Sequence, residues 1–333
     1  MEKVSWGVLG VSKMAVERTI PAMQQGLLSR IDAIASRDSA RAEACARQLG
    51  ILKSYGSYEA LLADPAIEAI YNPLPNNLHV AWTEKALQAG KHVLCEKPLA
   101  MNAAEAERLA AAQQRSGRLV MEGFMVRFHP QWLRVRELIA SGRIGAVRAA
   151  QGVVTYNNPD PANIRNIVEV GGGGIMDIGC YMIYFARLVF GTEPRQVIGR
   201  MERDPAMKTD RLASAILDFP QGQATFLCST QLARTQRFQV LGASGHITIE
   251  IPINAPPDRA CRIIVDDGRD VLGSGAEIVE LPVCNQYTLQ GDAFSACIRE
   301  GTKPPVTLAD SILNMRVIDA LFRSEKSCGW EKP

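Results

Sequence analysis

The sequence predicts a two-domain α/β protein, with a doubly wound parallel sheet in the N-terminal part and a mostly antiparallel sheet in the C-terminal part. Over roughly the first 120 residues, apolar strand patterns alternate with helical patterns, which is typical of βαβ units with right-handed crossovers. After Gly123, strand-like segments follow one another with turn residues between them, which favours antiparallel pairing. The chain has 333 residues, more than the roughly 50 to 250 of a usual single domain. We expect domains over 1–122 and 123–333, with the last helix packing back on the first domain.

In the first domain, runs of apolar residues predict strands and alanine-rich or periodic segments predict helices. The expected strands are 4–10, 31–35, 69–72, 92–96 and 119–122. The expected helices are 14–28 with an interruption near Pro21, 39–49, 58–63, 79–89 and 103–116.

In the second domain, helices are expected at 131–141, 177–190, 289–299 and 308–323, with a long loop over 157–169. Strands are expected at 147–155, 196–201, 213–219, 223–231, 236–242, 246–251, 262–266 and 277–281.

Composition limits the classes of function. The formal net charge is +2 without a basic block, which argues against nucleic acid or an anionic membrane as partner. The N-terminus enters a strand at once rather than a signal segment, and no apolar run approaches the roughly 20 residues that span a bilayer. The eight cysteines are scattered without a CxxC pair, so we expect reduced structural thiols, no metal and a cytoplasmic location.

A candidate nucleotide-binding turn follows the first strand. Gly10 allows a tight turn and Ala15 lets the following helix pack on the strand, as in a dinucleotide fingerprint, although Ser12 replaces the middle glycine. Amides at the start of the helix would then meet a pyrophosphate, which makes Gly10, Ser12, Lys13 and Met14 candidate cofactor-binding residues. A plain tight turn is the alternative.

The end of the second strand indicates which dinucleotide is preferred. In place of the acidic residue that binds a ribose 2′-hydroxyl stands Ser36-Arg37, and a hydroxyl with a guanidinium suits a 2′-phosphate better. Arg41, one helical turn further, would add a second cation. We therefore expect NADP rather than NAD, with Asp38 as a displaced ribose-binding acid and a solvated Arg37 as the alternatives.

Lys97, Asp177 and Tyr181 are the candidate catalytic residues. Lys97 follows an apolar strand, at the sheet edge where α/β proteins bind ligands, and Asp177 and Tyr181 stand four residues apart after the glycine run 171–174. Hydride transfer requires a proton to be exchanged with the substrate oxygen, and a tyrosine does this near neutral pH when a cation favours its phenolate. Lys97 is that cation, or stabilises an alkoxide directly, and Asp177 would bind a substrate hydroxyl. Packing for Tyr181 and a plain helix start for Asp177 are the alternatives.

Other polar residues are expected near the same crevice. Glu96 would position Lys97 or touch the nicotinamide ribose, unless the two form a solvated pair. Arg127 and Tyr287 are candidate substrate-binding residues, with Gln290 beside Tyr287. The segment after the third long strand supplies further candidate cofactor contacts: Leu74, Pro75, Asn76, Asn77 and His79. A lone histidine is more often structural, and no second ligand stands at metal spacing, so we expect no metal.

These motifs occur in an order that resembles the glucose–fructose oxidoreductase / inositol dehydrogenase (Gfo/Idh/MocA) family over nearly the whole chain. The matching pieces are 7–10, 75–79, 96–98 and 172–181. Within the family, 122–130 and 174–181 look most like NADP-dependent aldose (D-xylose-type) 1-dehydrogenases and dihydrodiol dehydrogenases, while 8–22 is similar to deoxysugar 3-ketoreductases. The resemblance implies a Rossmann domain, then a domain with an open-faced sheet that forms a homodimer or homotetramer, and it places Arg165 near the cofactor.

The sequence therefore predicts an NADP-dependent oxidoreductase that interconverts a sugar or polyol hydroxyl and its carbonyl, with aldose 1-dehydrogenation as the leading version. A ketoreductase of a nucleotide-linked deoxysugar and a dihydrodiol dehydrogenase are the alternatives of the same class. A non-catalytic protein that senses NADP(H) is the alternative of another class, because Ser12 departs from the glycine pattern.

Overall fold

The computed structural model describes residues 1–333, which divide into two compact units. The first unit comprises Met1–Phe128 and Asn285–Ile312, and the second comprises His129–Cys284 and Leu313–Pro333.

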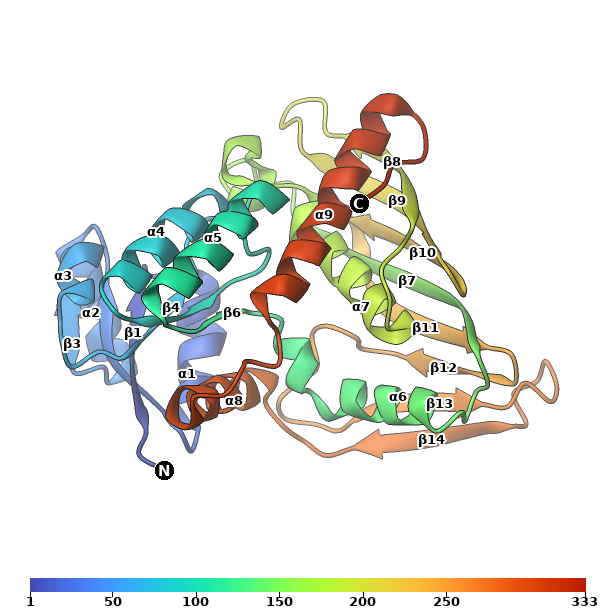
Figure 1. Ribbon diagram of the computed structural model, residues 1–333, viewed down its shortest axis with the longest axis horizontal. Helices are drawn as coiled ribbons and strands as arrows, with labels where there is room; N and C mark the ends of the chain where they lie inside the picture. The colour runs from blue at the N-terminus through green and yellow to red at the C-terminus, as the bar shows by residue number, and fades with distance from the viewer. The chain divides into compact units, whose positions relative to one another are not determined.

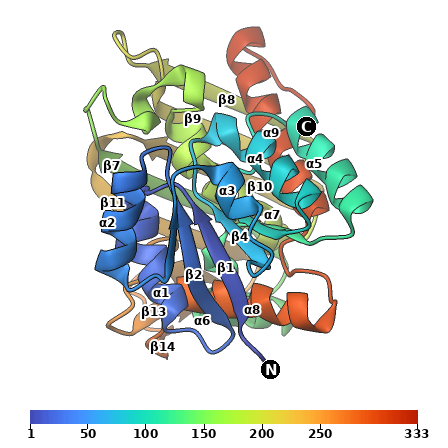
Figure 2. The ribbon, with the colours of Figure 1, turned by 90° about the vertical axis from the view of Figure 1, so that its left-hand side faces the viewer.

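The first unit contains a six-stranded sheet in the order β3-β2-β1-β4-β5-β6, in which every neighbouring pair is parallel. Figure 2 shows β1 and β2 lying side by side. This order confirms the predicted doubly wound parallel sheet of the Rossmann type. Strand β3 was not predicted, because its three residues form an edge without an apolar run. The strands are β1 Val4–Leu9, β2 Ser29–Ala35, β3 Lys53–Tyr55, β4 Ala69–Asn72, β5 His92–Cys95 and β6 Val120–Glu122.

The helices of the first unit begin where side chains or prolines cap them. Asp38, Ser57 and Asn102 each accept a hydrogen bond from the amide three residues on. Helices α4 and α5 pack side by side (Figure 1). The helices are α1 Ile20–Gln24, α2 Ser39–Leu49, α3 Tyr58–Leu62, α4 Asn76–Gln88, α5 Ala103–Ser116 and α8 Gln286–Glu300, with a π turn η1 Ala15–Thr19 and a 3-10 turn η2 Met125–Phe128.

Three helix predictions in this unit need correction, one of which is that the helix expected over 289–299 begins at Gln286, where Asn285 caps it. The helix expected over 14–28 ends at Gln24 and contains the π turn η1 directly before Pro21, a residue that lacks an amide hydrogen for a regular helical bond. The helix expected from residue 79 begins three residues earlier, because Pro75 occupies its N-cap position.

The second unit contains an eight-stranded sheet in the order β14-β13-β12-β11-β7-β10-β9-β8. Every neighbouring pair is antiparallel except β7 and β10, which confirms the predicted mostly antiparallel sheet. The strand expected over 223–231 ends at Ser229, and the strand expected from 236 begins at Gln231. The strands are β7 Val147–Asn157, β8 Gln196–Arg203, β9 Asp210–Phe219, β10 Gly222–Ser229, β11 Gln231–Gly242, β12 Gly245–Ile249, β13 Cys261–Asp266 and β14 Ala276–Leu281.

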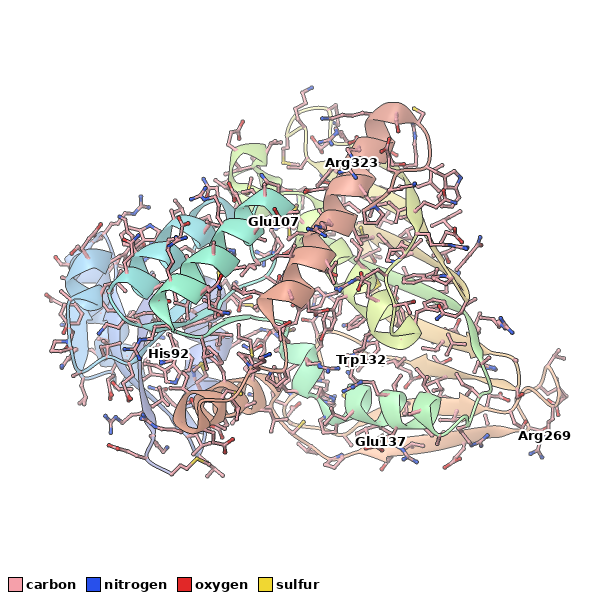
Figure 3. The ribbon with its side chains drawn as sticks, in the orientation of Figure 1. His92, Glu107, Trp132, Glu137, Arg269 and Arg323 are labelled. Carbon is pink, nitrogen blue, oxygen red and sulfur yellow. The ribbon has the colours of Figure 1, made fainter.

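One face of this sheet is covered by helices α6 Pro130–Ala140 and α7 Cys180–Phe190. Trp132 of α6, labelled in Figure 3, stacks on Phe185 of α7 at 3.9 Å between ring centroids, and Phe185 meets Phe238 of β11 at 5.4 Å. Helix α9, Leu308–Ser327, belongs to this unit from Leu313 onward. The opposite face is open, as the resemblance implied: Ile216 of β9 is 37% exposed there.

The segment Val168–Phe190 is long and apolar enough to cross a membrane by length and composition, which the sequence analysis had not expected. In the structure, 89% of its apolar window is buried inside the protein, as in the core helix of a globular domain. The segment is also not one regular helix. It contains a 3-10 turn η4 Val168–Val170 and a π turn η5 Ile175–Gly179 before α7.

Candidate active site

The turn after β1 is tight and has a positive φ at its glycine. Gly10 has a φ of 82°, and a Cβ there would lie 3.0 Å from Leu74 Cδ2 and 3.4 Å from the Tyr58 hydroxyl oxygen. The Ser12 hydroxyl accepts a hydrogen bond from the Ala15 amide at 3.2 Å, so the serine caps the first turn of the helix. The sheet order reverses between β1 and β4, and open α/β sheets bind ligands outside the carboxyl ends of strands at such a point. The sheet thus places this turn where the sequence predicted nucleotide binding.

The end of β2 presents cations rather than an available acid. The Asp38 carboxylate accepts a hydrogen bond from the Arg41 amide at 3.2 Å, because Asp38 is the N-cap of α2. Arg41 Nη2 donates to the Val11 carbonyl oxygen at 2.8 Å, which brings this guanidinium to the turn after β1. Ser36 is buried and Arg37 is exposed. Asp38 therefore has a structural role that accounts for it without a ribose.

His79 is a buried cross-link. Its side chain is fully buried, and its ring nitrogens lie 2.8 Å from the carbonyl oxygens of Pro98 and Leu74. Burial lowers the pKa of His79 to about 4, although both carbonyls favour the charged ring. The Asn72 side-chain amide, which was not predicted from the sequence, donates to the His79 carbonyl oxygen at 3.1 Å. His79 thus holds the segment after β4 against the segment after β5. No group of three or more His, Cys, Asp or Glu side chains that could hold a metal ion is present in the chain.

Glu96 and Lys97 follow β5. The Tyr71 hydroxyl donates to Glu96 Oε1 at 2.7 Å, and the Thr19 hydroxyl lies 3.0 Å from the same tyrosine oxygen. Because a tyrosine has one hydroxyl proton and a carboxylate only accepts, Thr19 is the donor in the second bond. Burial raises the pKa of Tyr71, and the negative charge of Glu96 adds to the increase. The Lys97 amide donates to Glu96 Oε2 at 3.3 Å, Lys97 is half-buried, and the Lys97–Pro98 peptide bond is cis.

Polar groups of α8 and η2 complete the candidates of the first unit. Tyr287 is buried, which raises its pKa; Glu96 adds to the increase and Arg18 opposes it. Gln290 is fully buried without a hydrogen-bond partner for either side-chain polar atom, and Arg127 Nη1 is buried in the same condition. Buried polar atoms of this kind are expected to have partners, so a bound ligand or water would satisfy them.

In the second unit, Asp177 is held by two side chains. Its Oδ2 accepts hydrogen bonds from the Tyr156 hydroxyl at 2.7 Å and from Arg165 Nε at 3.0 Å. The expected regular helix from Asp177 is corrected, because Asp177 lies in the π turn η5 and α7 begins at Cys180. The i,i+4 spacing of an α-helix therefore does not describe Asp177 and Tyr181. Tyr156 was missed because the predicted strand ended one residue before it.

Arg165 links Asp177 to Tyr181 electrostatically. Arg165 follows Asn163, whose side chain caps the 3-10 turn η3 Ile164–Asn166. The Asp177 carboxylate raises the pKa of Arg165, burial opposes this, and Tyr156 and Tyr181 contribute further increases. Burial also raises the pKa of Tyr156, with Asp177 adding to the effect.

Tyr181 itself is 2% exposed on α7, with its ring centroid 6.2 Å from that of Phe185. The Tyr181 ring therefore packs beside Phe185, and Tyr181 also interacts electrostatically with Arg165. Tyr181 and Arg165 belong to the second unit, whereas Lys97, Arg127 and Tyr287 belong to the first.

Two family models match the chain. Residues 4–124 match the Gfo/Idh/MocA oxidoreductase family with an NAD-binding Rossmann fold, and residues 132–248 match the Gfo/Idh/MocA C-terminal domain.

Curated relatives and solved structures match over almost the full length. The chain is 46% identical to an uncharacterized oxidoreductase of Rhizobium meliloti, over 99% of both chains. It is 37% identical to a D-xylose 1-dehydrogenase (NADP(+)) of Haloferax volcanii, over 97% of both chains. Among solved structures, a 3-ketoreductase from Actinomadura kijaniata in complex with NADP and TDP-benzene matches with a TM-score of 0.90 and 30% identity, over 97% of this chain and 98% of that one.

Proposed function

The chain belongs to the Gfo/Idh/MocA oxidoreductase family, and from this premise we propose that it is an NADP-dependent dehydrogenase that oxidises an aldose at its anomeric carbon. The observation that carries the substrate class is the 37% identity to an NADP-dependent D-xylose 1-dehydrogenase over 97% of both chains.

The residues of the first unit suit NADP. Gly10 has a φ of 82° and a Cβ there would lie 3.0 Å from Leu74 Cδ2, so this position favours glycine, and the tight turn would bring the following helix amides to a pyrophosphate. Ser36, Arg37 and Arg41 would hold the 2′-phosphate, because Asp38 is occupied as a helix cap and no acid competes there. The segment from Leu74 to Asn77, together with Glu96, would contact the riboses. When bound, the nicotinamide accepts or returns the hydride.

The remaining chemistry is a proton exchange at the substrate oxygen. We assign this exchange to the Tyr181 hydroxyl, with the Arg165 guanidinium as the nearby cation that favours its phenolate. Lys97 stabilises negative charge on the reacting oxygen. Asp177 keeps Arg165 in place through the 3.0 Å ion pair and binds a substrate hydroxyl. Arg127 and Tyr287 are the remaining candidate substrate contacts.

A second candidate is the reduction of a keto sugar. The match to the 3-ketoreductase complex covers 97% of the chain with a TM-score of 0.90, so the same fold and cofactor serve that reaction in a relative. The two candidates share Lys97 and Tyr181 and differ in the substrate.

The open face of the second-unit sheet is the proposed site of homo-oligomerisation. A groove of about 840 Å³ lies on this face, with the apolar side chains Val153, Ile198, Ile216 and Leu227 among its lining. Exposed apolar surface of this extent favours a partner, and a second copy of the chain is the occupant that we propose. Ile216→Arg should lower the assembly state in analytical ultracentrifugation, whereas Val271→Arg, at a fully exposed hairpin position, should not.

The test of function is a set of initial rates of NADP reduction with free aldoses, with NAD in parallel and keto sugars assayed with NADPH. Turnover of one or two aldoses with NADP supports the proposal. If keto sugars are reduced and no aldose is oxidised, the second candidate function is supported instead. Tight NADPH binding without turnover of any substrate supports a non-catalytic sensor of NADP(H). Tyr181→Phe serves as the control for background reduction.

A further inference from the structure

A buried carboxylate outside the residues predicted from the sequence lies at the start of the π turn η5, which carries Asp177 and leads into α7 with Tyr181. Asp210 is the first residue of β9 and is 1% exposed. Its Oδ2 accepts a hydrogen bond from the Ile175 amide at 2.6 Å. Ile175 begins the π turn η5 and precedes Asp177 by two residues, and Gly174 before it contributes no side-chain cap.

The glycine run gives Asp210 access to this amide. A Cβ at Gly173 would lie 1.9 Å from Asp210 Oδ1, and the φ of Gly173 is 125°. A Cβ at Gly174 would lie 3.3 Å from Asp210 Oδ2. Because they have no side chain, these two glycines let the backbone approach the Asp210 carboxylate closely, so the run is more than a flexible hinge.

The same run packs on the loop that carries Arg165. A Cβ at Gly172 would lie 2.6 Å from the Arg165 carbonyl oxygen and 2.7 Å from that of Ile167. The Gly173 amide donates to the Arg165 carbonyl oxygen at 2.8 Å. A shift of the glycine run would consequently move both partners of the Arg165–Asp177 ion pair.

We propose that Asp210 is a positioning residue: its carboxylate fixes the glycine run and the first turn of η5, and thereby the geometry of Asp177, Arg165 and Tyr181. The structural part of this inference stands on the contacts of the second unit, and only its catalytic consequence rests on the proposed function.

The surroundings of Asp210 favour a role that depends on its charge. The charged and titratable groups facing it are Arg203 of β8, Glu325 of α9 and Cys228 of β10. Arg203 is engaged by Glu325 through two hydrogen bonds of 2.8 and 2.6 Å. Burial raises the pKa of Asp210 to about 6, while the Ile175 amide and Arg203 oppose the increase and Glu325 adds to it. The carboxylate is therefore ionised at pH 7.5, the form that a helix N-terminus favours, and becomes protonated in mild acid.

The test compares Asp210→Asn with Asp218→Asn, a matched control on the same strand. Asp218 accepts hydrogen bonds from Arg195 and Gln196 and does not touch the glycine run. At pH 7.5, Asp210→Asn should accelerate amide hydrogen exchange in 171–181 and lower kcat by about tenfold to a hundredfold, since small misplacements of reacting groups have effects of this size. The affinity for NADPH should not change, and the fall of kcat that we expect near pH 6 in the unmodified enzyme should be absent from the variant. The control should match the unmodified enzyme in every measurement.

Unchanged exchange in 171–181 would overturn the proposal, and faster exchange with an unchanged kcat and pH profile would overturn its catalytic part. If the unmodified enzyme reduces or oxidises no sugar, the exchange measurement still decides whether Asp210 anchors the segment, and only the proposed function fails. If Asp210→Asn does not fold, exchange in the unmodified protein at pH 5 and pH 7.5, corrected for intrinsic rates, replaces it. Because the pKa of Asp210 is raised by burial, protonation opposes an opening that exposes this carboxyl, so protection of 171–181 relative to α6 should be higher at pH 5 than at pH 7.5. Equal protection at the two pH values would sink the idea.

Discussion

Tyr71 of the first unit donates its hydroxyl proton to Glu96 at 2.7 Å, and Tyr156 of the second unit donates to Asp177 at the same distance, but these two pairs are built differently. In the first unit, Tyr71 lies in β4 and Glu96 directly follows the neighbouring parallel strand β5, and the second partner of Tyr71 is the neutral Thr19. In the second unit, Tyr156 is the penultimate residue of β7 and Asp177 lies in a π turn. A second partner of Asp177 is the cation Arg165.

The difference fits a division in which the first unit binds the cofactor and the second carries out the proposed proton exchange. In the first unit, neutral hydroxyl groups hold the Glu96 carboxylate at the end of a regular strand, which suits the proposed role of Glu96 in contacting the cofactor. In the second unit, a cation and an acid on irregular turns lie beside phenols from β7 and α7, a set of titratable groups that suits the proposed proton exchange with the substrate.

The largest effect is expected from the second unit. Tyr181→Phe removes the proposed proton donor while retaining the ring that packs against Phe185. We expect kcat to fall by about a thousandfold, within the usual range for general acid–base residues, with the affinity for NADP unchanged. Steady-state rates and NADPH fluorescence titration measure the two quantities separately. Near-normal turnover would remove Tyr181 from the mechanism.

Buried acids provide a second contrast, in the dependence of stability on pH. Burial raises the pKa of Asp210 to about 6, above the unfolded value near 3.9. Its stabilising contribution is therefore complete below about pH 4 and is lost as the pH rises through 6, a change of about 3 kcal/mol for two pKa units. Relative to the unmodified protein, Asp210→Asn should become more stable between pH 4.5 and pH 7.5 in urea unfolding. A difference that does not change with pH would contradict this.

Asp64 of the first unit should behave in the opposite way and serves as the control. Lys53 and Tyr55 donate to its Oδ2 at 2.7 Å each, and these bonds lower the pKa of Asp64 to about 2. Its contribution is present above the unfolded value near 3.9 and is lost as the pH falls through 2. Asp64→Asn should therefore be less stable than the unmodified protein at pH 7.5, with a smaller deficit in strong acid.

The two tyrosine pairs themselves can be compared by matched substitutions. Tyr71→Phe removes the 2.7 Å donor of a buried carboxylate in the first unit and should lower the free energy of unfolding by about 1 to 3 kcal/mol. Tyr156→Phe leaves Arg165 on the same oxygen of Asp177, so the loss of stability should be smaller. Its main effect should be on kcat, which we expect to fall by about tenfold because Asp177 and Arg165 are less well positioned.

Urea unfolding and kcat of both variants test whether the pairs differ in this way. A larger loss of stability in Tyr156→Phe than in Tyr71→Phe would reverse the proposed division between the units.

The regular parts of the fold were predictable because their signals are local. The alternation of apolar runs with helical segments was sufficient for the parallel sheet of the first unit, and the succession of strands was sufficient for the antiparallel sheet of the second. The π turn η5 was not predictable, because it depends on a hydrogen bond from Ile175 to Asp210, 35 residues away. Propensity and periodicity do not encode contacts of that range.

The same limit applies to the site. The sequence predicted Lys97, Asp177 and Tyr181 from residue type and spacing, but not Tyr156, which reaches Asp177 across 21 residues. One signal for Asp210 was present in the sequence. Consecutive glycines indicate that the backbone approaches another group closely, and here that group is the buried acid Asp210.

The smallest expected effect concerns the cofactor and belongs to the first unit. Arg37 is exposed, so its replacement should disturb neither fold nor catalytic groups. Arg37→Ala should weaken NADPH binding by about tenfold, because one charge-assisted contact with the 2′-phosphate is lost, while NADH binding and kcat at saturation stay unchanged. Arg115→Ala, an exposed arginine near the end of α5, is the matched control. A fall in kcat at saturating NADPH would mean that the first unit also influences the reacting groups, and the division between the two units would then be wrong.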